Sequence, residues 1–283
     1  ISQSAPFVHY SEFRYNLVGV SVSGGWINNC DIHHNTVGIK CYSYGNTVFS
    51  YNTVYSNSPK GGIDADYQGT YSSNTIRNNI YSADHDDRVA GGIYVGSSNT
   101  SLDHNTIINN SCPDCGDSGS ALYIDRGGNI SDNIISNNTG ANGYAVWVKG
   151  TQSGSFVNNI ITDGKTYFDG PDFDGSWTNN LFVGGLSGYF EFSDDDAEFS
   201  KNSIFNSPGG GSSDKLKIQA DNDVDQTVYF SNNLFSNNSA GYTLEPGANN
   251  DAQTYVITTQ NNLINNDDGF YVKAPTVNYS VEN

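Results

Sequence analysis

The stretches Asn52-Thr-Val-Tyr-Ser-Asn57, Asn74-Thr-Ile-Arg-Asn-Asn79 and Asn105-Thr-Ile-Ile-Asn-Asn110 decide the fold of this chain. Each begins with an asparagine that is followed two positions later by Val or Ile. The pattern returns at intervals of 21 to 31 residues, with further copies that start at Asn133, Asn159, Asn180, Asn202, Asn233 and Asn262, and with Cys30 in the first position one repeat before Asn52. Such a period indicates a solenoid, in which each repeat stacks on the next.

A second short segment, Gly-Ile-x-x, follows each asparagine unit after a loop of variable length. Its copies are Gly38–Cys41, Gly62–Ala65 and Gly92–Val95, with looser ones at Ala121–Ile124 and Ala145–Val148. A third apolar segment precedes each asparagine, as at Val48 and Leu102. Apolar and polar residues alternate in all three segments, which is typical of half-buried strands. Three strands per repeat predict one all-β domain over residues 1–283, a parallel β-helix of about ten coils.

The recurring asparagine has a physical role in such a stack. Equivalent residues of adjacent coils lie about 4.8 Å apart, so the side-chain amide of one asparagine can bond with the next. A continuous ladder satisfies buried amide groups that would otherwise cost several kcal/mol each, roughly 2–7. We therefore predict an Asn ladder from about Asn52 to Asn262.

The asparagine turn, the variable loop and the Gly-Ile-x-Val strand together resemble the right-handed parallel β-helix repeat superfamily. That superfamily includes pectate lyases, other polysaccharide lyases, phage tailspikes and microbial surface proteins. The resemblance covers roughly residues 15–275 and implies a right-handed, single-stranded parallel β-helix. It specifies a fold and no chemistry. In the lyase-like members the strand after the variable loop forms the substrate face, which implies the Gly-Ile-x-Val strand here.

Three aromatic residues, Tyr94, Tyr123 and Trp147, take the outward position of that strand in successive coils. They are expected to form an exposed ladder with rungs about 4.8 Å apart. Aromatic faces suit the C–H-rich side of sugar rings, whereas an aromatic ladder can also serve only to stabilise a sheet. An exposed Trp147 gains nothing in folding unless something covers it, so we expect either a glycan or a neighbouring subunit on it.

Charged residues accompany the aromatic ladder: Asp64, Asp66, Asp125, Arg126 and Lys149. Asp66 and Asp125 are two coils apart, about 9–10 Å, near the upper end of the carboxylate separation in inverting glycosidases. A lyase would instead use Lys149 or Arg126 as its base. The catalytic candidates are therefore Asp66, Asp125 and Lys149, and the alternative is that Asp125 and Lys149 only pair with each other.

The charge of the chain limits its partners. Its net charge is −18, with 30 acidic against 12 basic residues. Nucleic acid is thereby excluded as a partner, and no apolar run of roughly 18 residues supports membrane insertion. Acidic loops at residues 84–88, 169–174, 194–196 and 221–225 suggest weak Ca²⁺ sites or simply solvated loops, and none has EF-hand spacing. The five histidines are interpreted as ordinary surface or turn residues.

The four cysteines and the glycosylation sequons favour an oxidising, extracellular location. We predict one disulfide between Cys30 and Cys41 across the coil interior, and a second between Cys112 and Cys115 within Cys-Pro-Asp-Cys. The sequons begin at Asn99, Asn109, Asn129, Asn137, Asn237 and Asn278.

Two functions stay open from the sequence. The first is an extracellular surface or filament-forming scaffold, adhesive and in contact with glycans. The chain has no recognisable amphipathic helix to cap either end, which favours stacking on a neighbour or continuation into a longer chain. The second is a polysaccharide lyase or glycoside hydrolase that acts on the exposed face of the Gly-Ile-x-Val sheet.

Overall fold

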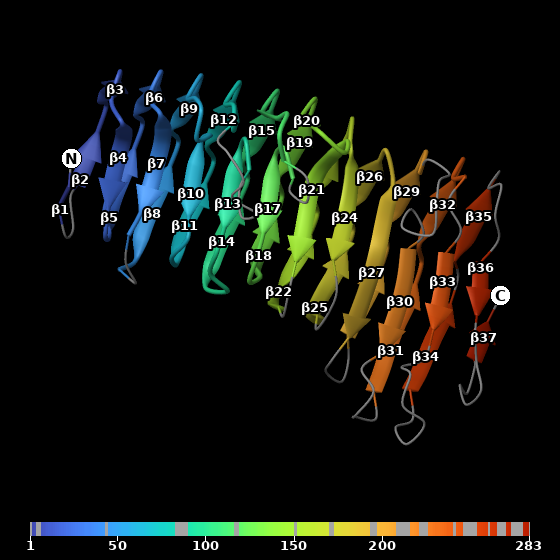
Figure 1. Cartoon of the computed structure of the whole chain (residues 1–283). Helices are drawn as coiled ribbons and strands as arrows, with labels where there is room; N and C mark the ends of the chain where they lie inside the picture. Colours follow the sequence, from blue (N-terminus) through green and yellow to red (C-terminus); the bar gives the residue numbers. More distant parts are fainter. Residues whose placement is uncertain are drawn as a thin grey trace.

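In its computed structural model the chain is a stack of coils, each built from three short parallel strands (Figure 1). The structure describes residues 2–3, 7–42, 45–82, 90–115, 119–149, 152–169, 173–192, 197–207, 216–220, 226–239, 242–245, 254–259, 261–264, 270–272 and 280–282, with side chains placed for most of these up to residue 239 and for Asn261. The coils follow one another in sequence order, so the two termini lie at opposite ends of the stack (Figure 1).

The strands form three long sheets, which we call A, B and C. Sheet A contains β1 (Ser2–Gln3), β4 (Val18–Val22), β7 (Val37–Cys41), β10 (Ile63–Ala65), β13 (Ile93–Val95), β17 (Leu122–Ile124), β21 (Tyr144–Lys149), β24 (Lys165–Asp169), β27 (Leu186–Phe192), β30 (Leu216–Ala220), β33 (Tyr242–Glu245) and β36 (Phe270–Val272). Sheet B contains β2 (Phe7–His9), β5 (Gly25–Asn28), β8 (Thr47–Ser50), β11 (Gly69–Ser72), β14 (Thr100–Asp103), β18 (Gly128–Ser131), β22 (Gln152–Val157), β25 (Phe173–Thr178), β28 (Ala197–Ser200), β31 (Gln226–Ser231), β34 (Thr254–Thr259) and β37 (Ser280–Glu282).

Sheet C contains β3 (Glu12–Arg14), β6 (Asp31–His33), β9 (Thr53–Tyr55), β12 (Thr75–Arg77), β15 (Thr106–Ile108), β19 (Ile134–Ser136), β23 (Ile160–Ile161), β26 (Leu181–Val183), β29 (Ser203–Phe205), β32 (Leu234–Ser236) and β35 (Asn262–Ile264). A small fourth sheet pairs β16 (Ser111–Cys112) with β20 (Thr139–Gly140).

The number of coils is higher than the sequence pattern suggests. Sheets A and B hold 12 strands each and sheet C holds 11, whereas about ten coils were predicted. The first coil does not show the pattern because Ser11 stands where the next coil has Cys30 and later coils have asparagine.

Among the described residues no helix is long and apolar enough to cross a membrane.

The core lies inside the three sheets and extends, in the described residues, from Val8 to Phe235. Residues alternate as predicted: Ile63 and Ala65 of β10 are buried in the core, while Asp64 between them faces outward. Core rings stack from coil to coil, as Phe49 does on Tyr71 with ring centroids 5.4 Å apart. The inward residue of β8 is thus Phe49, and not Val48 as the third apolar segment suggested.

The predicted Asn ladder is present, and its rungs are buried except for the last, Asn261, which is half-buried. Each side-chain Nδ2 donates to the Oδ1 of the next rung at 3.0 to 3.2 Å. The rungs are Asn52, Asn74, Asn105, Asn133, Asn159, Asn180, Asn202, Asn233 and Asn261. The predicted last rung, Asn262, is wrong by one residue because Asn262 belongs to β35, where it pairs with Leu234.

A second ladder, which the sequence interpretation missed, runs parallel to the first. Asn16, Asn35, Asn57, Asn79, Asn110 and Asn138 form it, with Nδ2–Oδ1 distances of 2.9 to 3.2 Å. These asparagines occupy the sixth position of the repeat. The residue before a rung has positive φ, as at Tyr51 (56°), His104 (53°) and Asp132 (57°). Consequently the side chains of these turn residues form a row along the edge between sheets B and C.

Candidate functional site

The outer face of sheet A is the predicted substrate face, and the structure aligns its aromatic residues as expected. Tyr94 of β13 pairs with Tyr123 of β17, and Tyr123 pairs with Trp147 of β21. The three side chains form a cluster separate from the main core, together with Ala90. The next rung is Tyr167 of β24, which the sequence interpretation missed because Lys165–Asp169 lacks the Gly-Ile-x-Val pattern.

The expected exposure of these aromatic residues is wrong. Tyr94 is 8%, Tyr123 0% and Trp147 4% exposed. The chain itself covers them, because Ala90 packs on the cluster from the segment before β13, and Tyr144 and Tyr167 pack against it. The centroid of the Tyr167 ring lies 4.2 Å from that of Trp147. The rings therefore form a small outer core instead of an open platform.

The predicted catalytic residues fall into one row at the ends of the same strands. Ala65 pairs with Val95, Val95 with Ile124, and Ile124 with Val148, so the next residues, Asp66, Gly96, Asp125 and Lys149, are also in line. The carboxylate of Asp66 lies over Gly96, where a Cβ would come within 2.5 Å of Asp66 Oδ1. The row brings the three candidates onto one face, and their catalytic roles stay a prediction.

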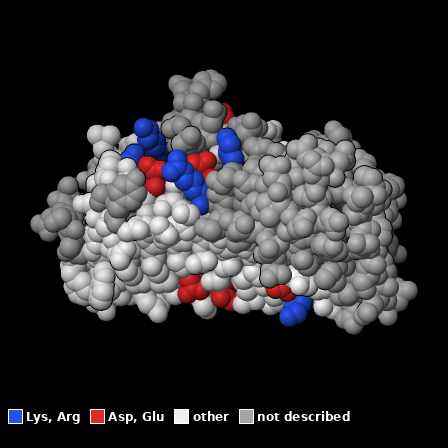
Figure 2. All heavy atoms as spheres, turned by 90° about the horizontal axis from the view of Figure 1, so that it is seen from below, with Lys and Arg blue, Asp and Glu red and all other residues white. Residues whose placement is uncertain are grey.

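Ion pairs link several charges on this face. In the view of Figure 2, basic and acidic side chains lie next to one another on the described surface. Lys40 Nζ lies 3.2 Å from Asp64 Oδ2. Burial alone would lower the pKa of Lys40, but the charge of Asp64 and the hydrogen bond that Lys40 donates to it outweigh burial, so the pKa is raised. Arg126 Nε lies 3.9 Å from Asp125 Oδ2, and the Arg126 side chain is largely exposed. Such mutual pairing is typical of a solvated structural surface.

An aromatic pair on the outer face of sheet B is exposed. Phe7 of β2 pairs with Trp26 of β5, and the two side chains are 62% and 56% exposed. Their ring centroids lie 5.6 Å apart. We call Phe7 and Trp26 the aromatic platform. The sequence interpretation overlooked it, although the inward phase of Ile27 already places Trp26 on the outside.

Hydrogen-bonding side chains lie close to the aromatic platform. His9 follows Phe7 on β2, and its Nδ1 contacts Asn28 Oδ1 of β5. Further along sheet B, in the turns before β8 and β11, Gln68 Nε2 donates to Asn46 Oδ1 at 3.1 Å on the surface. The described part of sheet B thus presents aromatic faces next to amide and imidazole groups.

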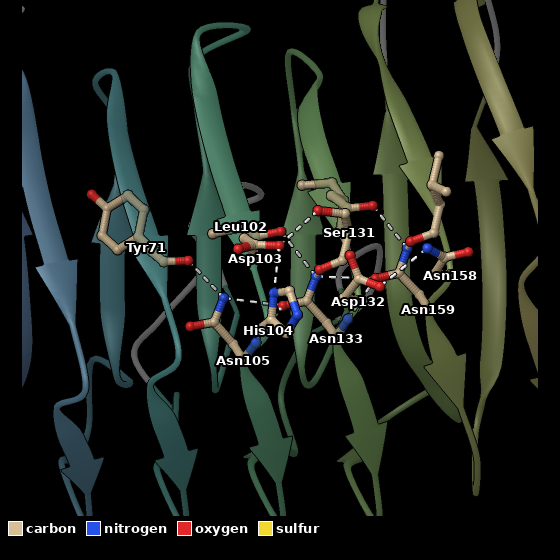
Figure 3. Close-up of polar contacts among 12 residues, drawn as sticks. Tyr71, Leu102, Asp103, His104, Asn105, Ser131, Asp132, Asn133, Asn158 and Asn159 are labelled. Atoms are coloured by element: carbon tan, nitrogen blue, oxygen red, sulfur yellow. Dashed lines mark hydrogen bonds and ion pairs between the residues drawn. The ribbon is translucent and has the colours of Figure 1, made fainter.

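A third candidate lies in the turns between sheets B and C. Asp103, His104 and Asp132 each place one ligand atom so that the three atoms lie within 4.8 Å of one another. Figure 3 shows these side chains gathered beside the Asn ladder, with Asp103 and His104 on one coil and Asp132 on the next. His104, which the sequence interpretation treated as an ordinary surface or turn residue, places its Nδ1 2.8 Å from Asp103 Oδ1.

The predicted weak Ca²⁺ sites cannot be placed on this geometry. Residues 84–88, 170–172, 194–196 and 221–225, which carry most of the acidic loops, lie outside the described residues.

Comparison with known families agrees with the geometry. Residues 3–121 match the family model described as a right handed beta helix region. The chain is a right-handed parallel β-helix. The match ends in the coil of β17, whereas the three sheets of the β-helix continue with unbroken pairing to its last described strands. No curated protein and no solved structure matches the chain.

The cysteines of the β-helix divide into one disulfide and two free thiols. Cys112 and Cys115 are bonded, with Cα atoms 5.3 Å apart, which confirms the predicted loop disulfide. The predicted Cys30–Cys41 bridge is wrong, since both residues are free and buried. Their sulfurs point to different partners: Cys41 Sγ lies 3.0 Å from Tyr71 Oη, and Cys30 Sγ donates to Asn28 O at 3.2 Å. An inward position alone does not bring two sulfurs together.

Five of the predicted sequon asparagines are exposed on the β-helix. They are Asn99, Asn109, Asn129, Asn137 and Asn237. The sixth, Asn278, lies outside the described residues. Accessibility is a condition for glycosylation, and whether the sites carry glycans stays a prediction.

Proposed function

We propose that this β-helix is an extracellular surface scaffold that contacts neutral glycans through the aromatic platform of Phe7 and Trp26. The observation that carries the proposal is the exposure of two adjacent rings, 62% for Phe7 and 56% for Trp26. The two rings lie outside the core, and a contiguous apolar patch on the surface favours contact with a partner.

The surroundings of the aromatic platform favour a sugar as that partner. Flat rings suit the C–H side of a pyranose, and the amide of Asn28 and the imidazole of His9, which lie on the same two strands as the platform, can bond hydroxyl groups. The net charge of −18 opposes polyanionic glycans, because like charges repel the encounter. A neutral polysaccharide is therefore the expected ligand class.

The rest of the fold favours a scaffold. Two Asn ladders and the parallel sheets tie each coil to its neighbours, so the described coils are expected to behave as a rigid support. The aromatic residues expected to hold a substrate on sheet A are packed under the chain itself. Extracellular location is supported by the Cys112–Cys115 disulfide and the five exposed sequons.

Tryptophan fluorescence tests the proposal directly. The protein has three tryptophans; Trp147 and Trp177 are 4% and 2% exposed, against 56% for Trp26. Acrylamide therefore quenches mainly Trp26. A neutral polysaccharide that binds the aromatic platform should reduce this quenching in a saturable manner.

Two variants complete the fluorescence test. Trp26→Ala should remove glycan binding in calorimetry, whereas Tyr42→Ala, which truncates an exposed ring directly after β7 of sheet A, should leave it unchanged. Equal binding by the two variants, or no protection of Trp26 by any polysaccharide in the panel, would contradict the glycan proposal. If the wild-type protein releases product from a polysaccharide of this panel, and Asp125→Asn abolishes that release, the protein is an enzyme. Self-association of the protein also stays a prediction, and light scattering would measure it.

A further inference from the structure

The turn cluster of Asp103, His104 and Asp132 differs from the other acidic surface groups in its composition. It combines one imidazole with two carboxylates, and one ligand atom from each lies within 4.8 Å of the other two. Asp103 ends β14, and His104 follows it in the turn. Asp132 occupies the position of His104 one coil later, because Asp103 and Ser131 are paired. The cluster therefore spans two successive coils (Figure 3).

The backbone beneath the cluster is held in place. Asn105 and Asn133 directly follow His104 and Asp132, and Asn105 Nδ2 donates to Asn133 Oδ1 at 3.0 Å. Because both asparagines are buried rungs of the first ladder, the two turns keep a constant separation. The ligand set is thus presented by ordered backbone on both coils.

Neighbouring side chains donate hydrogen bonds to both carboxylates of the cluster. Ser131 Oγ donates to Asp103 Oδ1 at 3.0 Å, and Asn158 Nδ2 donates to Asp132 Oδ1 at 3.1 Å. Asn179 Nδ2 in turn donates to Asn158 Oδ1 at 2.7 Å. Hydrogen bonds of this kind orient carboxylates that bind metals. Figure 3 shows the bonds of Ser131 and Asn158 to the two carboxylates.

The charge of the cluster is not balanced by basic residues. Within the described coils the ion pair at Asp103 is with His104, and no Lys or Arg pairs with either carboxylate. Two carboxylates at this separation repel each other, and a cation between them would remove the repulsion.

We propose that Asp103, His104 and Asp132 bind a first-row divalent cation of the Zn²⁺ class, which clamps two successive coils. An imidazole nitrogen with two carboxylate oxygens suits Zn²⁺ or Mn²⁺. Ca²⁺ prefers an all-oxygen shell of about six to eight ligands, so it should bind more weakly. The three protein ligands leave coordination positions for water.

Zinc calorimetry on tag-free, chelator-treated protein tests the proposal. Wild type should bind one equivalent of Zn²⁺ in the micromolar range or tighter, and its melting temperature should rise with added Zn²⁺. His104→Asn and Asp132→Asn should each weaken Zn²⁺ binding by about tenfold or more. Neither change should disturb the fold, because Asn158 and Asn179 already occupy this turn position in other coils, with φ of 58°.

The chain offers a matched control for each substitution. His34→Asn removes an imidazole from another turn residue with φ of 53°, and Asp163→Asn removes a carboxylate at φ of 62°. Both controls should keep wild-type Zn²⁺ affinity. The proposal is overturned if wild type has no saturable Zn²⁺ site, if His104→Asn and His34→Asn bind equally, or if Ca²⁺ binds as tightly as Zn²⁺.

Discussion

Two groups of aromatic side chains occupy outward positions on this β-helix, and solvent reaches only one of them. Tyr123 and Trp147 on sheet A are 0% and 4% exposed, whereas Phe7 and Trp26 on sheet B are 62% and 56% exposed. Both groups sit on adjacent rungs of parallel strands. The difference is that Ala90, Tyr144 and Tyr167 pack over the sheet A group. An outward position in a solenoid therefore becomes a binding surface only where neighbouring side chains leave it uncovered.

The largest expected effect is at Trp147. If its indole is packed as tightly as a core side chain, Trp147→Ala should lower the free energy of unfolding by about 3–5 kcal/mol. Guanidinium titration followed by circular dichroism measures this change. A loss below about 1 kcal/mol would mean that the cover over sheet A opens in solution, and the comparison between the two aromatic groups would fail.

The ladder beneath both surfaces should be the next most sensitive feature. Asn133→Ala removes the Oδ1 that accepts from the Nδ2 and the N–H of Asn105. Each buried donor left without a partner costs about 1–3 kcal/mol, so we expect a loss of about 3 kcal/mol. Asn129→Ala, at an exposed position of the same coil, is the control and should change stability by less than about 0.5 kcal/mol.

The interior differs from the outer faces in how its buried groups make the free energy of unfolding depend on pH. Burial raises the pKa of the Cys41 thiol to about 12, and burial also raises the pKa of Tyr71. Both groups ionise more readily in the unfolded chain, so their stabilising contribution is complete below about pH 8.5 and is lost as the pH rises toward 12.

Between pH 8 and 10 the expected loss in the free energy of unfolding from Cys41 is about 2 kcal/mol. Urea titrations at the two pH values measure it, and Cys41→Ala should reduce the pH dependence. In native protein at pH 8, iodoacetamide should leave Cys30 and Cys41 unmodified, because both are buried. Rapid alkylation of either thiol would show that the interior is accessible.

The smallest expected effect on stability is at the aromatic platform. Because Trp26 is 56% exposed, Trp26→Ala should change the free energy of unfolding by no more than about 0.5 kcal/mol, while it removes glycan binding. A loss of several kcal/mol, comparable with that of Trp147→Ala, would indicate that Trp26 is a structural residue and that the platform is not a binding surface.

The sequence pattern was sufficient to predict that two residues of the candidate metal site are neighbours. His104 and Asp132 each stand one position before a ladder asparagine, and those asparagines are 28 residues apart. Equal placement in successive repeats is enough to predict that the two side chains are neighbours. The approach of Asp103 to His104 was not predictable in this way, because it depends on turn dihedral angles and side-chain rotamers.

The sequence by itself determined the β-helix, the phase of most strands and the position of the first ladder. These features follow from period-two alternation and from one asparagine per coil, which are local patterns that stacking repeats along the chain. Only the tertiary structure decided that Trp147 is covered and Trp26 is exposed, and that Cys30 and Cys41 have different partners. The physical reason is that coverage and side-chain contact depend on which side chains of different coils come together, as Ala90, Tyr144 and Tyr167 do on sheet A, and these contacts follow no repeating pattern in the sequence.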